Sequence, residues 1–327
     1  MKMETRAYRI AQCGGSPVWL MTADQEMILA HCPRKLSDQL VVGDWVTCDA
    51  QLQVDQIQPR TSYLKRFQAG RTSEHQGMAA NFQHVWIVTS ANEDFNLRRL
   101  ERYLSLAWSS GGMPSIVVSK CDLITDRDEY ALRLQVHAPG TAAFFTSSLK
   151  GFGIEQLVDS MNKGDTAVLI GSSGVGKSTL VNTLTGRSTQ HTGAIRSDGK
   201  GRHITTNRIL LPLPGGRFLI DTPGMREVAP TDTEGMDQVF PEIHELAEQC
   251  HFSDCSHSGE PGCAVMTAVD QGLLDADRLA SFQRLGKEIE FEQQRHDQRY
   301  RLKKKQHDKT LARAIRQMTQ KHRKYRD

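Results

Sequence analysis

Long apolar segments are absent from this sequence of 327 residues. It contains no run of about eighteen apolar residues, the length at which a membrane-spanning helix becomes possible. Residues 1–10 lack the basic stretch followed by an apolar stretch that marks an export signal. We therefore expect a protein that is neither inserted in a membrane nor exported.

A cysteine framework for disulfides is also absent. The cysteines number seven, which is odd, and four of them lie outside any cluster: Cys13, Cys32, Cys48 and Cys121. Scattered cysteines are typical of a reducing compartment rather than of a secreted fold held by disulfides. We expect a cytoplasmic protein, and its hydrophobic content of 38% and charged content of 24% suit a soluble globular chain.

Positive charge is concentrated at the C-terminal end. Residues 295–327 contain thirteen Lys or Arg and three Asp, a net charge of +10 in a chain whose total is +3. The rest of the chain therefore carries a net charge of −7. A basic tail on a mildly acidic protein indicates a polyanionic partner, and a solvated charged helix is the alternative.

The first sixty residues predict short strands separated by turns. The expected strands cover residues 8–11, 18–22, 27–31, 44–48 and 54–59. Short strands at this spacing, without helical periodicity, favour a small β-barrel. We predict an OB-like, RNA-binding barrel over residues 1–65, although the strand count alone also allows an SH3-like barrel.

From about residue 66 strands alternate with helices. Strands are expected at 85–90, 116–119, 143–146, 167–170, 209–213 and 218–221, with helices such as 97–109 and 154–161 between them. This alternation is typical of an α/β domain with a largely parallel sheet, which we place at residues 66–230. A mainly helical domain should follow at 231–327, with helices at 236–249 and from 273 onward.

A phosphate-binding loop follows the expected strand at 167–170. Residues 171–178 match G-x-x-x-x-G-K-[ST] and open a helix, so strand, loop and helix occur together as the motif requires. We expect Lys177 to reach the β- and γ-phosphates and Ser178 to bind Mg²⁺. The residues expected around the nucleotide are Gly171, Ser172, Ser173, Gly174, Val175, Gly176, Lys177, Ser178 and Thr179.

Two further motifs complete the expected phosphate site. The D-x-x-G motif at 221–224 ends a strand, so Asp221 can hold the Mg²⁺ shell and the Gly224 amide can sense the γ-phosphate. The loop at 201–206 (GRHITT) can offer Thr205 to the same Mg²⁺. Such loops order around the γ-phosphate and relax after hydrolysis.

A motif that reads the base is expected at 119–122 (SKCD), which resembles N-K-x-D. Guanine presents N1–H and an exocyclic amine that one carboxylate accepts together, whereas N1 of adenine is an acceptor. Asp122 should therefore bind the guanine edge, and the Lys120 stem should cover the ring. Ser147 and Ser148 resemble the companion loop whose backbone contacts the guanine oxygen.

Ser119 stands where this motif usually has Asn. A hydroxyl is shorter than an amide, so we expect Ser119 not to connect neighbouring loops as Asn does. The predicted consequence is somewhat weaker nucleotide binding with the preference for guanine retained.

The order of the motifs is permuted. The base-reading motifs at 119–122 and 146–150 precede the phosphate loop, whereas in ordinary GTPases they follow it. Such a permutation is acceptable because the termini of a compact domain often lie close together. The D-x-x-G segment then leads directly into the C-terminal domain, and we expect a movement that depends on the γ-phosphate to reach that domain.

Four potential metal ligands lie within fourteen residues: Cys250, Cys255, His257 and Cys263. Thiolates and an imidazole at such short spacing suit a closed tetrahedral Zn²⁺ site without an open position. We predict one structural Zn²⁺, whose removal unfolds this domain and leaves nucleotide binding intact. A disulfide is disfavoured in a reducing compartment.

With these motifs, the chain resembles the circularly permuted ribosome-assembly GTPases of the RsgA or YjeQ family. The resemblance covers nearly the whole length: the barrel, GSSGVGKST at 171–179, GRHITT at 201–206 and the Cys/His loop. It implies GTP/GDP with Mg²⁺ as ligands, binding to the small ribosomal subunit and its rRNA, and a role late in subunit maturation. We expect a monomer without a membrane or DNA partner.

The residue that orients the attacking water is not the usual one. Many GTPases place Gln after D-x-x-G, and here that residue is Met225, so we expect slow intrinsic turnover that a partner accelerates. The resemblance and the position of the loop suggest His203 as the replacement, and a surface or RNA-contacting histidine is the alternative. Lys177 and Thr205 are the other expected catalytic residues.

Two other functional classes stay open. A P-loop ATPase or kinase is one, and Asp122 and Thr205 argue against it. The other is an RNA-binding scaffold or switch with a non-ribosomal partner, which would use GTP as a structural ligand. The barrel and the basic tail could also bind nucleic acid without sequence specificity.

Overall fold

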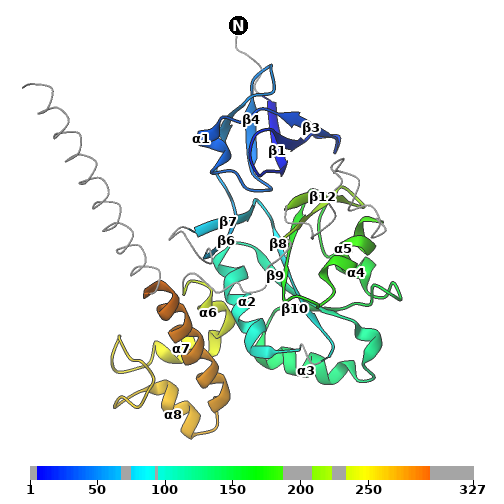
Figure 1. Cartoon of the computed structure of the whole chain (residues 1–327). Helices are drawn as coiled ribbons and strands as arrows, with labels where there is room; N and C mark the ends of the chain where they lie inside the picture. The colour runs from blue at the N-terminus through cyan, green and yellow to red at the C-terminus, as the bar shows by residue number, and fades with distance from the viewer. Residues whose placement is uncertain (1–5, 68–74, 93–94, 187–207, 223–232, 295–327) are drawn as a thin grey trace, which may run out of the picture.

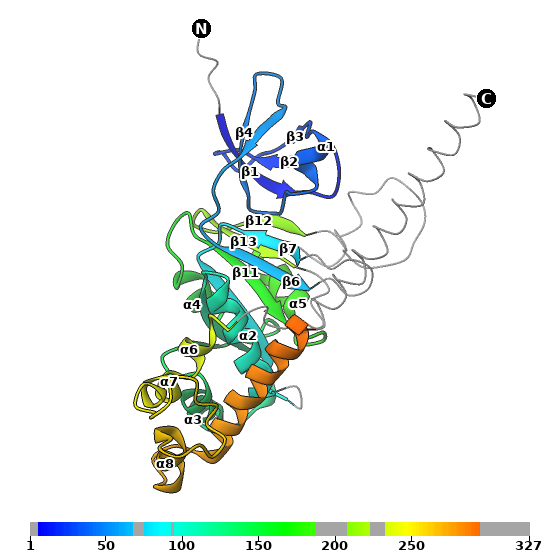
Figure 2. The same ribbon diagram turned by 90° about the vertical axis from the view of Figure 1, so that its left-hand side faces the viewer.

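The computed structural model describes residues 6–67, 75–92, 95–186, 208–222 and 233–294. Three regions follow one another along the chain: a barrel, an α/β sheet and a group of helices (Figures 1 and 2). The fold class predicted from the sequence is confirmed. The boundaries at residues 65 and 230 stay predictions. Among the described helices, none combines the length and the apolar character needed to cross a membrane.

The N-terminal region is a five-stranded barrel with strand order β3-β2-β1-β4-β5. Its edge strands β3 and β5 meet through a parallel bridge, where the His31 amide donates to the Leu52 carbonyl at 3.0 Å and the Val54 amide to the His31 carbonyl at 2.9 Å. A short helix between β3 and β4 and this closure are the arrangement of an OB-like barrel. The elements are β1 (Arg6–Gln12), β2 (Val18–Met21), β3 (Met27–Ala30), α1 (Arg34–Ser37), β4 (Trp45–Cys48) and β5 (Val54–Ile57).

The central region is a six-stranded sheet with order β10-β9-β8-β11-β13-β12. Neighbouring strands are parallel except β12 and β13, which form an antiparallel pair. Its strands are β8 (His84–Ser90), β9 (Met113–Ser119), β10 (Ala142–Phe145), β11 (Thr166–Gly171), β12 (Ile209–Leu213) and β13 (Arg217–Asp221). Its helices are α2 (Leu97–Ser109), α3 (Arg127–His137), α4 (Ile154–Asp159) and α5 (Lys177–Thr185), with a 3-10 turn at Cys121–Leu123.

Apolar side chains alternate between the two faces of this sheet, as the pleat of a strand dictates. On β8, Val85 and Ile87 enter the core shared with α2 and α3, whereas Trp86 and Val88 enter the core shared with α4 and α5. Because helices cover both faces of the sheet, residues pointing to either face are apolar, and the strands appear in the sequence as continuous apolar runs.

A hairpin of β6 (Tyr63–Phe67) and β7 (His75–Ala80) lies between the barrel and the sheet (Figure 1). Two contacts fix this junction. Buried Arg9 of β1 donates to the Thr166 hydroxyl at 2.6 Å and to the Asn81 carbonyl at 2.5 Å. Gly43, at φ +93°, comes so close to the hairpin that a Cβ there would lie 2.1 Å from the Ala80 carbonyl oxygen. The barrel is therefore fixed against the central sheet by specific packing.

Within residues 233–294 the C-terminal region contains α6 (Met236–Val239), α7 (Pro241–Ala247), α8 (Ala264–Asp270) and a helix over 276–294. The prediction of one helix at 236–249 is wrong, because Pro241 lacks an amide hydrogen and drives Phe240 out of the helical region, to φ −125° and ψ 55°. The last helix begins at 276 rather than at 273. Phe240, Ile243 and Ile289 pack into the same continuous core as α2.

Candidate nucleotide site and zinc centre

The phosphate loop connects the central strand β11 to the first turn of α5. Gly171, at φ +143°, passes so close to β8 that a Cβ would lie 2.3 Å from the Val88 carbonyl oxygen. Gly176, at φ +92°, begins α5 in the left-handed region that favours glycine. Ser178 and Thr179 are exposed on the first turn, where the backbone amides of a helix favour anions. The local geometry predicted from the motif is present.

The side chain of Lys177 folds back over this loop. Its Nζ donates to the Gly171 carbonyl at 2.6 Å and to the Ser172 carbonyl at 2.5 Å. Burial lowers the pKa of Lys177, and the charge of Asp221 opposes this effect. Burial likewise raises the pKa of the Asp221 carboxyl, and the charge of Lys177 opposes it. Lys177 opens the helix after β11 and Asp221 ends the adjacent strand β13, so their charges interact at the same edge of the sheet.

The base-reading motif lies directly beside the phosphate loop. Strands β8, β9 and β11 are parallel neighbours, so their carboxyl ends meet at one edge of the sheet. Lys120 Nζ donates to the Gly174 carbonyl at 2.9 Å. Ser119 Oγ lies 2.5 Å from the Val175 carbonyl and 3.0 Å from the Thr89 carbonyl. The Ser119 hydroxyl therefore reaches the phosphate loop, while the expectation that it does not connect loops as Asn does, with weaker nucleotide binding, stays a prediction.

The second half of the base site is the loop that follows β10. A hydrogen bond from the Ser147 hydroxyl lowers the pKa of the exposed Asp122 carboxyl below its ordinary value. Ser147 also exchanges two backbone hydrogen bonds with Phe152, at 3.0 and 3.1 Å, which close a tight loop containing Ser148. The ring of Phe152 lies under the Arg127 guanidinium at 4.2 Å. The ordered loop thus lies next to the Asp122 carboxylate, and guanine recognition needs both.

Several predicted residues lie outside the described part of the chain. They are His203, Thr205, Gly224 and Met225, together with the basic tail at 295–327. Their assigned roles stay predictions.

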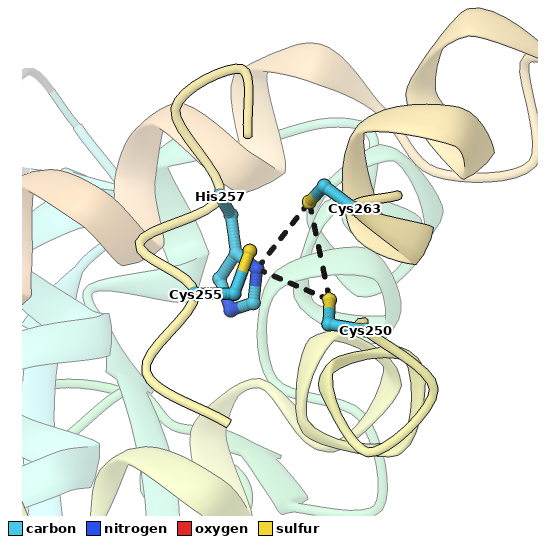
Figure 3. Close-up of side chains that lie close together, drawn as sticks. All are labelled: Cys250, Cys255, His257 and Cys263. Carbon is cyan, nitrogen blue, oxygen red and sulfur yellow. Dashed lines mark hydrogen bonds between the residues drawn. The ribbon is translucent and has the colours of Figure 1, made fainter. Parts of the chain in front are cut away.

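The four Cys/His residues meet between α7, α8 and the loop that joins them (Figure 3). Cys250 Sγ lies 3.9 Å from Cys263 Sγ, and each sulfur lies 3.6 Å from His257 Nδ1. All four ligand atoms, including that of Cys255, lie within 4.8 Å of one another. A tetrahedral Zn²⁺ with sulfur at about 2.3 Å and nitrogen at about 2.1 Å implies S–S and S–N separations of roughly 3.8 Å and 3.6 Å. The donor set and its spacing therefore fit zinc.

Two side chains that no sequence motif indicated support the zinc loop. Glu260 accepts hydrogen bonds from the Ser256 amide at 3.0 Å and the Ser258 amide at 2.8 Å, and its Oε2 lies 3.7 Å from Cys255 Sγ. Gln283 of the last helix donates to the His257 carbonyl at 2.7 Å. An acidic residue inside a Ser- and Gly-rich ligand loop was the available signal for Glu260. Outer partners of this kind orient metal ligands.

One further contact at the phosphate loop was also missed. Arg99 of α2 donates from Nη1 to the Ser172 hydroxyl at 2.6 Å. The two residues are separated by 73 positions in the sequence, so no local pattern predicts their meeting.

Comparisons with known proteins agree with this geometry. The family model described as RsgA GTPase matches residues 57–230. The small ribosomal subunit biogenesis GTPase RsgA 2 of Lactiplantibacillus plantarum is 44% identical over 256 residues, which cover 77% of this chain and 72% of that protein. The small ribosomal subunit biogenesis GTPase RsgA of Streptomyces coelicolor is 43% identical over 277 residues, which cover 82% of this chain and 75% of that protein.

Solved structures share the fold over most of the chain. YjeQ from Thermotoga maritima aligns with a TM-score of 0.65 and 26% identity, covering 87% of this chain and 98% of that chain. YloQ, a circularly permuted GTPase, aligns with a TM-score of 0.63, covering 88% of this chain and 96% of that chain; its 24% identity limits the likeness to the fold. The permuted order predicted from the motifs is confirmed.

Proposed function

The chain belongs to the RsgA GTPase family, and we propose that it binds the small ribosomal subunit and its rRNA, hydrolyses GTP there and assists late maturation of the subunit. The observation that carries this proposal is the contact between the base-reading motif and the phosphate loop at one sheet edge. The names of the relatives supply the ribosomal partner. The protein would act as a monomer in the cytoplasm.

Guanine recognition depends on Asp122 and its surroundings. The Asp122 carboxylate, whose pKa a hydrogen bond from Ser147 lowers, can accept both N1–H and the exocyclic amine of guanine. Lys120, held against Gly174, would cover the base with its aliphatic stem. Ser147 and Ser148 would contact the guanine oxygen. Adenine would leave Asp122 without these donors, which argues against an ATPase.

Phosphate binding requires the Lys177 ammonium to exchange its present partners for the phosphates. Its ammonium now contacts two loop carbonyls, and we expect it to move to the β- and γ-phosphate oxygens when GTP binds. There it would stabilise the negative charge that develops as the terminal phosphoanhydride bond breaks. The amides of residues 171–179 would hold the remaining oxygens.

Ser178, Thr205 and Asp221 are the residues proposed to hold Mg²⁺. When bound, Mg²⁺ would neutralise charge on the transferred phosphoryl group. Asp221 is suited to this role because burial raises the pKa of its carboxyl, so that a nearby cation would stabilise the ionised form. The Gly224 amide would sense the γ-phosphate.

The attacking water lacks the usual glutamine, since Met225 follows the D-x-x-G motif. We propose His203 as the residue that orients this water, with the subunit needed to complete the site. His203→Ala that retained full subunit-stimulated hydrolysis would remove this assignment.

Co-sedimentation tests the partner. The protein should pellet with purified small subunits more with a non-hydrolysable GTP analogue than with GDP, and large subunits should not replace them. Lys177→Ala should lose the difference between nucleotides because the phosphates lose their main cation. Equal pelleting with small and large subunits would remove the assignment to the small subunit, and pelleting with neither would remove the ribosomal assignment. A Lys177→Ala protein that functions normally would favour the scaffold instead.

A further inference from the structure

Two neighbouring arginines stand at the amino end of α2, where a helix disfavours positive charge. The Asn96 side chain caps this helix by accepting a hydrogen bond from the Arg99 amide at 3.0 Å, so Arg98 and Arg99 lie in the first turn. That turn contains no acidic residue. The partial positive charge of a helix amino end opposes cations there. Positive side chains at this end of a helix do not stabilise it, which points to another role for these arginines.

Arg98 is exposed, whereas Arg99 is partly buried and faces the phosphate loop. Arg99 lines a small cleft together with Val88, Tyr103 and Ser172. Its Nη1 donates to the Ser172 hydroxyl at 2.6 Å, the short distance expected of a hydrogen bond from a charged donor. Leu100 of the next position is buried, so the backbone that carries Arg99 is anchored in the core.

Ser172 is thus held by two cations. Arg99 binds its hydroxyl and Lys177 binds its carbonyl. When Lys177 transfers to the phosphates of a nucleotide, the carbonyl loses that partner, but the contact with Arg99 can persist. Of these two contacts to Ser172, the one from Arg99 is therefore available in both states to hold the start of the loop in place.

We propose that Arg99 is a positioning residue that holds the phosphate loop, through Ser172, in the shape that binds guanine nucleotides. The proposal rests on the proposed function of this loop. It assigns Arg99 no contact with substrate. Because the loop is needed equally by GDP and GTP, Arg99 should strengthen the binding of both and leave the rate of bond cleavage in the bound complex nearly unchanged.

The test measures dissociation constants of fluorescent GDP and of a fluorescent non-hydrolysable GTP analogue for five proteins: wild type, Arg99→Ala, Ser172→Ala, the double variant and Arg98→Ala. Loss of a hydrogen bond to a charged group should raise both dissociation constants about tenfold in Arg99→Ala. Ser172→Ala should weaken both in the same direction. The double variant should bind no more weakly than Arg99→Ala, because the two substitutions remove the same hydrogen bond.

Steady-state hydrolysis separates positioning from chemistry. Arg99→Ala should raise KM and keep kcat within about threefold, and Arg99→Lys should recover part of the affinity because one donor can still reach Ser172. Arg98→Ala, with the same change of charge on the same helix, should match wild type in both assays.

Three results would overturn the proposal. They are affinities of Arg99→Ala equal to those of Arg98→Ala, additive losses in the double variant, and a fall in kcat with unchanged affinity, which would indicate direct contact with the reacting phosphate. Ser172→Ala keeps the test valid if Arg99→Ala fails to fold. Failure of the wild type to bind guanine nucleotides would instead refute the proposed function.

Discussion

The buried ion network between α2 and the last helix offers a quantitative test of how the C-terminal region is attached. The side chains of Glu101 and Arg278 are both only 3% exposed, and Arg278 Nη1 lies 2.9 Å from Glu101 Oε1. The same carboxylate oxygen lies 2.9 Å from His137 Nδ1 on α3. Three elements therefore converge on one carboxylate.

Glu101→Gln removes the charge and keeps the shape. Breaking a buried pair by removing one partner costs about 3 to 5 kcal/mol, because the other charge stays buried without compensation. Arg278 keeps a second ion pair, from Nε to Glu242 at 2.6 Å, and the Glu242 side chain is 37% exposed. This residual partner places the expected loss near the lower limit, at about 3 kcal/mol.

Calorimetry measures the loss as a shift of the thermal transition. A destabilisation of about 3 kcal/mol should lower the transition temperature by roughly 6 to 12 °C for a unit of 150 to 250 residues. Glu129→Gln is the matched control, because its pair with Arg133 is 3.9 Å long and the Glu129 side chain is 63% exposed. It should shift the transition very little.

Restoring neutrality should recover stability. The double variant Glu101→Gln/Arg278→Met replaces the buried pair with neutral side chains, and we expect it to be more stable than Glu101→Gln alone. A Glu101→Gln transition no lower than that of Glu129→Gln would refute the reasoning, since it would mean that the network contributes no more than a surface pair.

Removal of zinc by a chelator, or Cys255→Ser, should increase hydrogen exchange over 233–294. The affinity for GDP should change less than about twofold, because α5 packs in the core on the opposite face of the sheet from the zinc region. A large loss of GDP binding would contradict this. Asp122→Ala should reduce the preference for GTP over ATP by about a hundredfold in a competition assay, and an unchanged preference would remove the base-reading assignment. Ser147→Ala should move the acid limit of GDP binding to higher pH. The Ser147 hydroxyl lowers the pKa of Asp122, so binding is retained above that lowered pKa and lost as the pH falls through it; identical pH profiles for variant and wild type would exclude this role.

Much of the fold could be predicted because the sheet is covered on both faces. The apolar runs around residues 85–90, 116–119 and 167–170 mark its central strands without ambiguity. The phosphate loop and the zinc ligands were also accessible, since each depends on residue types at short, fixed spacing. The order of these motifs was enough to identify the permutation.

The remaining features depend on contacts between distant parts of the chain. Arg278 and Glu101 are 177 positions apart, and Arg99 and Ser172 are 73 apart, so only the fold brings them together. The hairpin of β6 and β7 bonds to both neighbours, through the Ala80 amide to the Val42 carbonyl and the Tyr63 amide to the Ser110 carbonyl. The contact between Ser119 and Val175 was likewise not predictable, because the two residues are 56 positions apart and meet only at the sheet edge.

The most direct test of the central claim is GTP hydrolysis by the purified protein, alone and with purified small ribosomal subunits, with large subunits and ATP as controls. The account predicts slow hydrolysis alone, a rise of orders of magnitude with small subunits only, and no comparable turnover of ATP. Equal rates with and without small subunits would contradict the proposed ribosomal role and leave a GTPase that has another activator.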